Sequence, residues 1–413
     1  MRILWLATVG SYYNGVGWVN SLKELVETTG NELALAFLSD DLKEKQVIGN
    51  TTYYPVRCPK NTFFRRLKEH YGGYKKNDGL MYLPELQRII NDFQPDAIHV
   101  FGLEIPFSDI LRNTDVPVIV HLQGLLVPAD NAFFPAGMSE QTFRYPISKN
   151  EWILRNGILY DKKKMHARAE REAALWKKVR IVMGRTEWDC QMTQLFAPKA
   201  QYYHVDEVLR QVFYENAGKW HRKEGIFTIV STITPVLYKG FDTILKTAEM
   251  LAENTDLKFV WKVVGLDENS YFVKILEKKL GICGKSVNID YQGVKTADEL
   301  CEILLNADVY VHPSYIDNSS NSVCEAQMLG VPVVATYVGG TPSLIENGKD
   351  GFLVPANGVF ELAQLLERLH ADSVLCENVS RNAVATAIAR HDKEKIVDDL
   401  MKVYQTVTGL AAK

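Results

Sequence analysis

The residues that could do chemistry gather in one stretch between Val309 and Pro355. It reads VYVHPSYIDNSSNSVCEAQMLGVPVVATYVGGTPSLIENGKDGFLVP, and the carboxylates of Asp317 and Glu325 bracket its polar part. The five residues after Asp317 are all small and polar: Asn318, Ser319, Ser320, Asn321 and Ser322. A polar loop that enters a helix presents backbone N–H groups, and these attract an anion together with the helix dipole. The first hypothesis is therefore a phosphate-bearing ligand.

The apolar pattern predicts the elements that position these side chains. A buried strand over Val309–His312 ends in the polar loop, and a short helix that closes at Gly330 follows it. A second strand then leads through the Gly339-Gly340 turn into another helix. Open α/β sheets bind ligands where the carboxyl end of a strand meets a helix N-terminus. Because this arrangement is expected twice, we expect two helix N-termini to face the anion.

The ordered motif in this stretch resembles the donor-binding core of retaining glycosyltransferases of the GT-B type, the group 1 or family-four class. That family carries P-S-x-x-E, seven residues, E-A-x-x-x-G-x-P-V-V-A-T, then G-G and D-G-x-L-V. The chain matches the pattern at Pro313, Ser314, Glu325, Ala326, Gly330, Pro332, Val333, Val334, Ala335, Thr336, Gly339, Gly340, Gly351, Leu353 and Val354. It departs at Asp317, where the family has Glu. The side chain is shorter by one methylene, so its contact is expected to differ or to run through water.

The resemblance implies an α/β fold with two Rossmann-like, doubly wound parallel-sheet domains facing a cleft. It implies a retaining, metal-independent transfer of a sugar from a UDP- or GDP-type donor to a hydroxyl acceptor, with no cofactor. In the family the leaving-group phosphate takes the acceptor proton, and the counterpart of Glu325 binds the donor ribose. Asp317 and Glu325 are accordingly expected to be catalytic. The expected setting is the assembly of capsule, exopolysaccharide or lipopolysaccharide on a glycan or lipid-linked glycan acceptor.

A lysine is expected to hold the donor diphosphate. Lys239-Gly240 follows the first strand of the second half, and relatives carry an Arg about five residues before this pair. Thr234 stands at that position, so Arg185, Lys262 or the helix N-termini are expected to supply the missing positive charge. The alternative for Lys239 is a solvated loop lysine.

The loop NGVGW after the first strand carries Gly15 and Gly17. A dinucleotide-binding fingerprint would have a third glycine where Asn20 stands, so a nicotinamide enzyme is only weakly indicated. In similar glycosyltransferases this loop faces the donor phosphates, and only glycine allows so close an approach of the backbone. We therefore expect Gly15 and Gly17 to bind the donor, with a simple tight turn as the alternative.

Four further features have a functional interpretation, a structural one or both. His121 ends the apolar run PVIVH and is expected to point into the cleft and bond a sugar hydroxyl, or else to be a packing or capping residue. The long aromatic loop Leu125–Trp152 is expected to bind the acceptor. His312 is expected to be structural. Glu325 also completes a capping box with Ser322, which would give it a role without any ligand.

Alternating strand and helix patterns divide the 413-residue chain into domains. We expect an acceptor-side domain over residues 1–213, a polar linker over 214–223 and a donor domain over 224–390. A last amphipathic helix over 391–413 is expected to pack back on the N-terminal domain, as the resemblance implies.

Composition narrows the classes of partner and location. A net charge of -3 argues against nucleic acid, and no apolar run approaches the roughly 20 residues needed to span a bilayer. The six cysteines lack C-x-x-C spacing, which indicates reduced structural thiols in a cytoplasmic protein. The basic amphipathic stretch Lys60–Tyr71 is expected to pack in the core or to rest on an anionic membrane.

Two alternative functions share the same expected fold. A sugar-nucleotide epimerase would bind the donor in the same way without an acceptor. A non-catalytic nucleotide-sugar-binding protein would bind it without turnover.

Overall fold

The computed structural model describes residues 1–8, 18–40, 44–58, 78–144 and 157–409. The chain forms two compact units. Unit 1 contains residues 1–130, 163–208 and 391–413, and unit 2 contains residues 131–162 and 209–390. This division differs from the expected one in two respects. Residues 131–162 group with the C-terminal sheet, and the change of unit lies between Val208 and Leu209 and not within 214–223.

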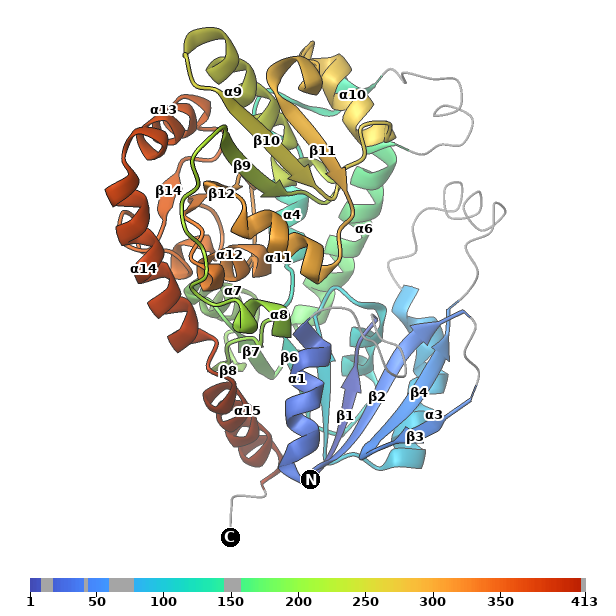
Figure 1. Ribbon diagram of the computed structural model, residues 1–413. Helices are drawn as coiled ribbons and strands as arrows, with labels where there is room; N and C mark the ends of the chain where they lie inside the picture. The colour runs from blue at the N-terminus through green and yellow to red at the C-terminus, as the bar shows by residue number, and fades with distance from the viewer. Residues whose placement is uncertain (9–17, 41–43, 59–77, 145–156, 410–413) are drawn as a thin grey trace. The chain divides into compact units, whose positions relative to one another are not determined.

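Unit 1 contains an eight-stranded sheet in the order β3-β4-β2-β1-β5-β6-β7-β8 (Figure 1). All neighbouring pairs are parallel except β3 and β4. The strands are β1 (Arg2–Leu6), β2 (Glu32–Ser39), β3 (Gln46–Ile48), β4 (Thr51–Arg57), β5 (Ala97–Phe101), β6 (Val118–His121), β7 (Ile181–Gly184) and β8 (Gln201–His204). Strands β1 and β5 are almost wholly apolar because helices bury both of their faces.

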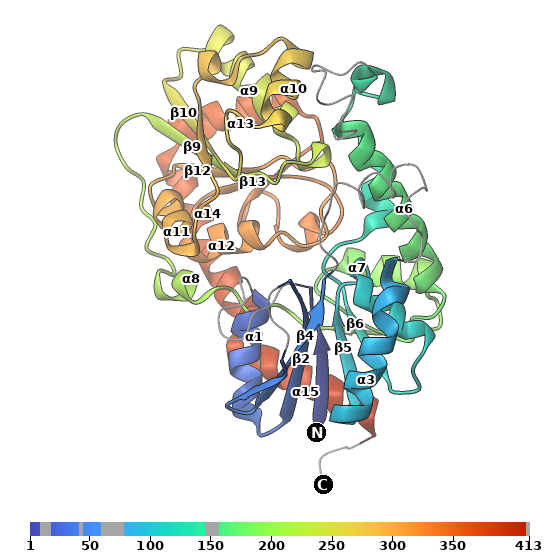
Figure 2. The ribbon, with the colours of Figure 1, turned by 90° about the vertical axis from the view of Figure 1, so that its right-hand side faces the viewer.

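Helices cover the two faces of this sheet. Figure 2 shows α1 on one face and α3 on the other. The apolar stripe of α3 packs on alternate residues of β1, β2 and β5, as the helical spacing of its buried residues requires. The C-terminal helix α15 belongs to this unit and contacts both α1 and β5. The helices are α1 (Trp18–Val26), α3 (Leu83–Phe93), α4 (Leu126–Asn131), α6 (Ile158–Trp176, in this unit from Lys163), α7 (Glu187–Phe196) and α15 (Lys393–Thr408).

Unit 2 contains a six-stranded, fully parallel sheet in the order β11-β10-β9-β12-β13-β14. The strands are β9 (Phe227–Thr232), β10 (Phe259–Val264), β11 (Ile289–Gly293), β12 (Val309–His312), β13 (Val333–Thr336) and β14 (Phe352–Val354). Because β9, β12 and β13 are neighbours, the loops that follow them meet at one edge of the sheet.

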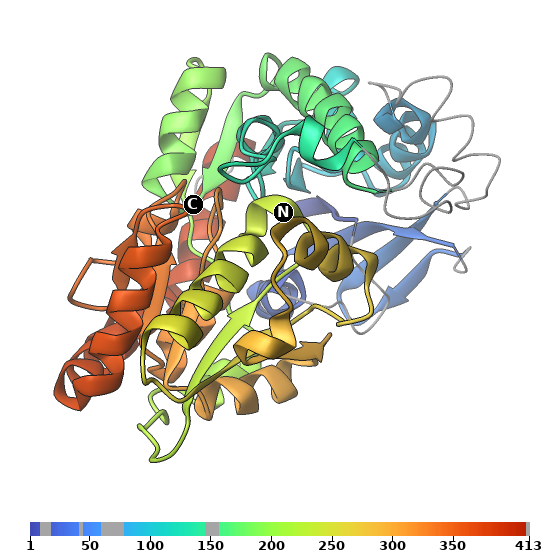
Figure 3. The same cartoon turned by 90° about the horizontal axis from the view of Figure 1, so that it is seen from above.

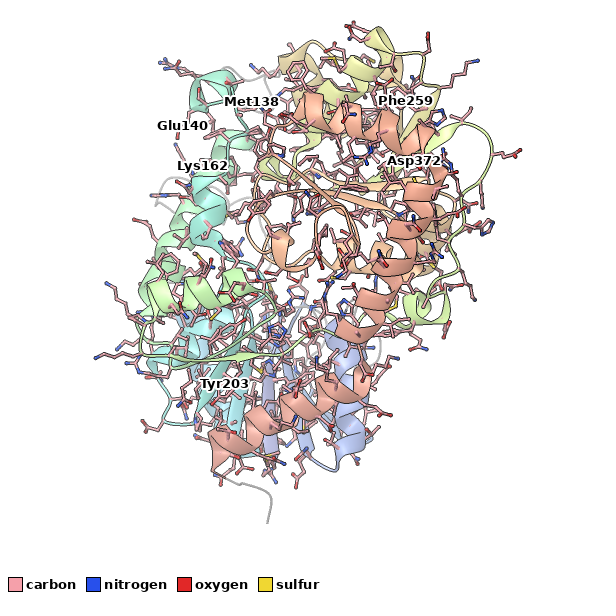
Figure 4. All side chains as sticks on the ribbon, turned by 90° about the vertical axis from the view of Figure 1, so that its left-hand side faces the viewer. Met138, Glu140, Lys162, Tyr203, Phe259 and Asp372 are labelled. Carbon is pink, nitrogen blue, oxygen red and sulfur yellow. The ribbon has the colours of Figure 1, made fainter. Side chains whose placement is uncertain are left out.

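Helices also cover both faces of the second sheet. Figure 2 shows α9, α10 and α13 on one side and α11 and α12 on the other, and Figure 3 shows α9 beside α13. The helices are α8 (Gln211–Glu215), α9 (Phe241–Asn254), α10 (Tyr271–Leu280), α11 (Ala297–Leu305), α12 (Asn321–Leu329), α13 (Val359–Ala371) and α14 (Ser373–Arg390). Asp372 marks the junction of α13 and α14 (Figure 4).

The stretch Leu125–Trp152 is not the structureless loop that its length indicated. It contains α4 and a 3-10 turn over Glu140–Phe143, while residues 145–156 lie outside the described residues. Figure 4 labels Met138 and Glu140 in this stretch. The ring centroids of Phe133 and Phe134 are 5.1 Å apart. Aromatic side chains of this stretch therefore pack on one another. The basic amphipathic stretch Lys60–Tyr71, expected to pack in the core or to rest on a membrane, also lies outside the described residues.

Candidate functional site

Three neighbouring strands of unit 2 bring the predicted donor-side residues to one sheet edge. Lys239 follows β9, Asp317 follows β12, and Gly339 follows β13. Parallel pairing aligns the carboxyl ends of these strands, so their loops converge.

The Asp317 carboxylate is the centre of this arrangement. Its Oδ2 accepts hydrogen bonds from Lys239 Nζ at 2.6 Å and from His312 Nε2 at 2.7 Å, while its Oδ1 accepts one from the Asn318 backbone N–H at 2.9 Å. Burial on its own raises the pKa of the Asp317 carboxyl, but the Lys239 charge and the His312 hydrogen bond outweigh burial and hold it well below its usual range. Asp317 is therefore an anion held by these three donors.

A close backbone contact fixes the position of Lys239. Gly240 has a φ of +79°, and a Cβ on it would lie 2.0 Å from the Pro313 carbonyl oxygen. Only glycine can occupy this place, so the loop after β9 lies directly on the start of the loop after β12. Burial lowers the pKa of the Lys239 ammonium, yet the adjacent Asp317 more than compensates, and the pKa is raised. With 22% of its side chain exposed, Lys239 is a charged group held at the loop edge.

Gly339 and Gly340, which follow β13, contact the backbone of the loop that contains Asp317. The Gly340 N–H donates to the Asp317 carbonyl at 3.0 Å. Gly339 has a φ of +49°, and a Cβ there would lie 2.0 Å from the same carbonyl oxygen. We expected a second helix N-terminus after these glycines, and this expectation is wrong. The glycines lead into a 3-10 turn of three residues, Thr341–Ser343. Gly339 and Gly340 thus shape the loop, and α12 supplies the helix N-terminus near it.

The buried Glu325 has a half-buried charged partner that the sequence pattern did not indicate. Arg210 donates from Nε and Nη2 to the two carboxylate oxygens of Glu325, each at 2.8 Å, which is the bidentate geometry typical of such pairs. Burial raises the pKa of the Glu325 carboxyl, and the Arg210 contact opposes this effect. The carboxylate is 4% exposed and points into the unit at this pair.

The capping box predicted for Ser322 and Glu325 is wrong. Helix α12 begins at Asn321 with Ser320 as its N-cap, and no side chain caps it. Ser322 lies inside the first turn, where its hydroxyl accepts a hydrogen bond from Tyr310 at 2.7 Å. Glu325 therefore pairs with Arg210 and does not cap α12.

The polar loop between the two carboxylates is mostly buried. Asn318, Ser319 and Ser320 are each less than 9% exposed, while Asn321 and Ser322 are half-buried. All five side chains that follow Asp317 in this loop, Asn318 to Ser322, are small and polar. This is the feature that the anion hypothesis requires of the loop.

The predicted residues of unit 1 form a separate buried cluster. His121 at the end of β6 is fully buried, and its Nδ1 lies 3.2 Å from His99 Nε2. Burial, His99 and Arg185 all lower the pKa of His121 well below its usual value. Arg185 forms a buried ion pair with Glu207. The expected donor glycines Gly15 and Gly17 lie outside the described residues.

Lys262 is the remaining residue that was expected to supply the positive charge missing at Thr234. Lys262 lies within strand β10, paired with Val230, and not in a loop after a strand.

Within the described ranges, no group of three or more His, Cys, Asp or Glu side chains is arranged to hold a metal ion. None of the six cysteines, all of which lie within the described residues, forms a disulfide, and no described helix is long and apolar enough to cross a membrane.

Sequence reasoning missed several residues of the site. His312 was expected to be structural, but it bonds Asp317 directly. Its position five residues before Asp317, at the end of a strand, was the available signal. Arg210 is 115 residues from Glu325, and no local pattern links the two.

Comparison with known proteins finds a match to a family model in the second half of the chain. Residues 213–386 match the family model described as "Glycosyl transferases group 1". A D-inositol 3-phosphate glycosyltransferase of Streptomyces bingchenggensis is 35% identical over 140 residues, covering 33% of this chain and 31% of the relative. The N,N'-diacetylbacillosaminyl-diphospho-undecaprenol alpha-1,3-N-acetylgalactosaminyltransferase of Campylobacter jejuni is 26% identical over 204 residues, covering 49% and 50%. The alignments therefore span half of these relatives or less.

Solved structures match the fold along almost the whole chain. Sucrose-phosphate synthase from Thermosynechococcus elongatus has a TM-score of 0.71 at 14% identity, with 99% of this chain and 100% of that chain covered. WaaG, a glycosyltransferase involved in lipopolysaccharide biosynthesis, has a TM-score of 0.63 at 14% identity, with 98% and 100% covered. Each of the two sheets is thus part of a GT-B fold, as predicted.

Proposed function

We propose that this chain, whose residues 213–386 match the family model of the group 1 glycosyl transferases, moves a sugar from a nucleotide diphosphate donor to a hydroxyl acceptor with retention of configuration. The observation that carries the proposal is the fixed pair of Lys239 and Asp317 beside the N-terminus of α12. A cation and a helix N-terminus at one sheet edge suit a diphosphate leaving group.

The charges at this edge suggest how the donor would be held. Lys239 would neutralise part of the charge that builds on the departing phosphate, and the N-terminus of α12 would stabilise the rest. With Thr234 in place of the family's arginine, Lys239 would carry a larger share than in relatives that have both cations. Asp317 would keep the ammonium in place before the donor arrives. Catalysis would then rest on positioning and electrostatic stabilisation.

Two finer parts of the proposal concern the proton and the metal. The leaving-group phosphate would take the acceptor proton on the face from which it departs, so no carboxylate nucleophile is needed. The donor diphosphate would be neutralised by Lys239 and helix N–H groups, so the transfer would be independent of divalent metal.

The names of relatives suggest the biological setting. Proteins similar to this chain include the capsular polysaccharide biosynthesis glycosyltransferase CapM of Staphylococcus aureus, 23% identical over 190 residues with 46% of this chain and 44% of the relative covered. We accordingly propose surface polysaccharide assembly on a glycan or lipid-linked glycan acceptor. Contact with an anionic membrane through Lys60–Tyr71 remains part of this proposal.

A donor screen tests the proposal on the purified chain. Nucleoside diphosphates and their sugars are added one at a time, and the melting temperature is measured, because a ligand of the folded state raises it by mass action. The donor that binds is then incubated with simple glycoside acceptors, with and without a chelator, and the anomeric configuration of the product is read by NMR.

We expect one nucleotide class to stabilise the chain and the product to keep the donor's configuration in the presence of chelator. An inverted product would overturn retention, and activity that disappears with chelator would overturn metal independence. Conversion of the donor into a stereoisomer without acceptor would favour an epimerase. Stabilisation without any turnover of donor would favour a binding protein.

A further inference from the structure

A hydrogen-bonded chain of four buried side chains runs through unit 1 from the C-terminal helix to the end of β6. Trp5 Nε1 donates to the Tyr404 hydroxyl at 2.9 Å, and this hydroxyl lies 2.6 Å from His99 Nδ1. His99 Nε2 in turn lies 3.2 Å from His121 Nδ1. All four side chains are fully buried. The other ring nitrogen of His121, Nε2, is buried and has no hydrogen-bond partner among the described residues.

The donors and acceptors in this series of side chains determine the direction in which each hydrogen bond is donated. An indole N–H can only donate, so the Tyr404 O–H cannot be directed at Trp5. The only acceptor within hydrogen-bond distance of Tyr404 among the described residues is His99 Nδ1. When Nδ1 accepts, a neutral His99 carries its proton on Nε2 and donates it to His121 Nδ1. His121 must then carry its own proton on Nε2.

The opposite direction leaves more groups unsatisfied. If His99 carried its proton on Nδ1, the Tyr404 oxygen would accept two hydrogen bonds and its O–H would have no acceptor. His121 would then donate from Nδ1 and leave a bare Nε2 lone pair in a buried site. A buried donor without an acceptor loses its full hydration, so this arrangement is disfavoured.

Both imidazoles are neutral in this environment, as the argument requires. Burial lowers the pKa of His99 to about 3. Burial lowers the pKa of His121 as well, and the neighbouring His99 and Arg185 lower it further. Trp18 packs edge-on against the His121 ring at 5.1 Å between centroids and helps to hold its plane.

We infer that Tyr404 and His99 are positioning residues that present His121 as an N–H donor at Nε2. The role of this donor in transfer rests on the proposed function. There it would bond an oxygen of the sugar or of a phosphate, and it has no lone pair at Nε2 with which to remove the acceptor proton. The C-terminal helix α15 thus contributes to the site chemistry by carrying the Tyr404 hydroxyl to β5.

Nitrogen NMR on the ¹⁵N-histidine-labelled chain tests the inference, because the shifts of Nδ1 and Nε2 distinguish the two neutral tautomers and the imidazolium. His121→Asn and His99→Asn variants assign the signals. At neutral pH we expect His121 and His99 to be protonated on Nε2. In Tyr404→Phe the direction is no longer fixed, so a substantial fraction of His121 should move its proton to Nδ1.

Trp5→Phe is the matched control. It removes another buried donor of the same hydrogen-bonded series, but the Tyr404 O–H and its bond to His99 remain. His121 should therefore keep its Nε2 proton in Trp5→Phe. The inference is overturned if His121 carries its proton on Nδ1 or is an imidazolium in the parent chain. It is also overturned if Tyr404→Phe, shown to be folded by its melting curve, leaves the His121 tautomer unchanged. The spectrum requires no donor or acceptor, so failure of the proposed transferase activity would be seen separately in the donor screen.

Discussion

The ammonium of Lys239 and the carboxylate of Asp317 lie 2.6 Å apart at the edge where β9 and β12 end. Two glycines impose this relationship, because Gly240 touches the Pro313 carbonyl and Gly339 touches the Asp317 carbonyl. The ion pair is therefore set by the backbone and not by the flexible lysine side chain. A preformed cation costs little reorganisation when an anionic leaving group develops.

The glycine contact can be tested with a pair of substitutions. Gly339→Ala places a Cβ against the Asp317 carbonyl, whereas Gly348→Ala has a similar positive φ of +80° with open space around it. Alanine at a positive φ strains the backbone of both variants by about 1 kcal/mol, and only Gly339→Ala must also displace the Asp317 loop. We expect Gly339→Ala to lose nucleotide affinity about tenfold while Gly348→Ala keeps it. Equal affinities in calorimetric titrations would show that the contact does not shape the site.

A double-mutant cycle measures the pair of Arg210 and Glu325. Glu325→Gln and Arg210→Gln should each lower the free energy of unfolding by about 1.5–3 kcal/mol, because a charged hydrogen-bonded partner is lost from a largely buried site. The double variant should lose less than the sum of the two. Urea unfolding checks this result, and strictly additive losses would contradict an energetic link between the two side chains.

The inferred donor role of His121 predicts an order among its variants. Gln places its amide nitrogen near the position of Nε2, whereas Asn places it near Nδ1. His121→Gln should therefore retain about tenfold more turnover than His121→Asn, since one charge-assisted or strong hydrogen bond corresponds to such a factor. Melting temperatures provide the control for folding. Loss of turnover to the same extent in both variants would remove the Nε2 donor from the reaction.

A buried carboxyl in unit 1 predicts a pH dependence of stability. Burial raises the pKa of Glu104 from 4.5 to about 8 in the folded chain. Folding therefore favours the protonated form, and stability is lost as the pH rises from the unfolded value through the folded one. Glu104→Gln mimics the protonated form, so its stability relative to the parent should rise by the order of 1 kcal/mol or more between about pH 5 and pH 8.

Urea unfolding at both pH values measures this difference. The exposed Glu24→Gln is the matched control and should show no such trend. A Glu104→Gln advantage that is the same at both pH values would contradict the raised pKa.

Local pattern was sufficient for most of the fold. The strand Val309–His312 and the helix that closes at Gly330 form as predicted, because an apolar strand pattern marks the first and the glycine ends the second. Helix α14 was not predicted because the residues that it buries are mostly small. They are Cys376, Val379, Ser380, Ala383 and Ala387. Strand β8 was missed because QYYH is a largely exposed edge strand without an apolar pattern; Figure 4 labels its Tyr203.

Site residues could be predicted where the signal is local in the sequence. They could not be predicted where it depends on contacts between residues far apart in the sequence. Asp317 and Lys239 were predicted as site residues because each follows a strand, and Glu325 because it lies in a recognisable motif. The partners of two of the candidates come from far along the chain, namely Arg210 for Glu325 and, through His99, Tyr404 for His121. Capping was assigned to Ser322 because Glu325 stands three residues later, but the helix begins earlier and Ser320 is its N-cap. The Ser322 hydroxyl accepts a hydrogen bond from Tyr310.

The most direct test of the central claim is the affinity for the nucleotide diphosphate sugar, measured by calorimetric titration of the parent chain, Lys239→Met and the exposed control Lys349→Met. Lys239 faces the proposed diphosphate, whereas Lys349 pairs with Glu346 on the surface of the same unit. A charge-assisted contact contributes about 1.5–3 kcal/mol, so Lys239→Met should bind the donor at least about tenfold more weakly. Lys349→Met should bind it like the parent chain. Parental affinity in Lys239→Met, or no affinity of the parent for any such donor, would contradict the account.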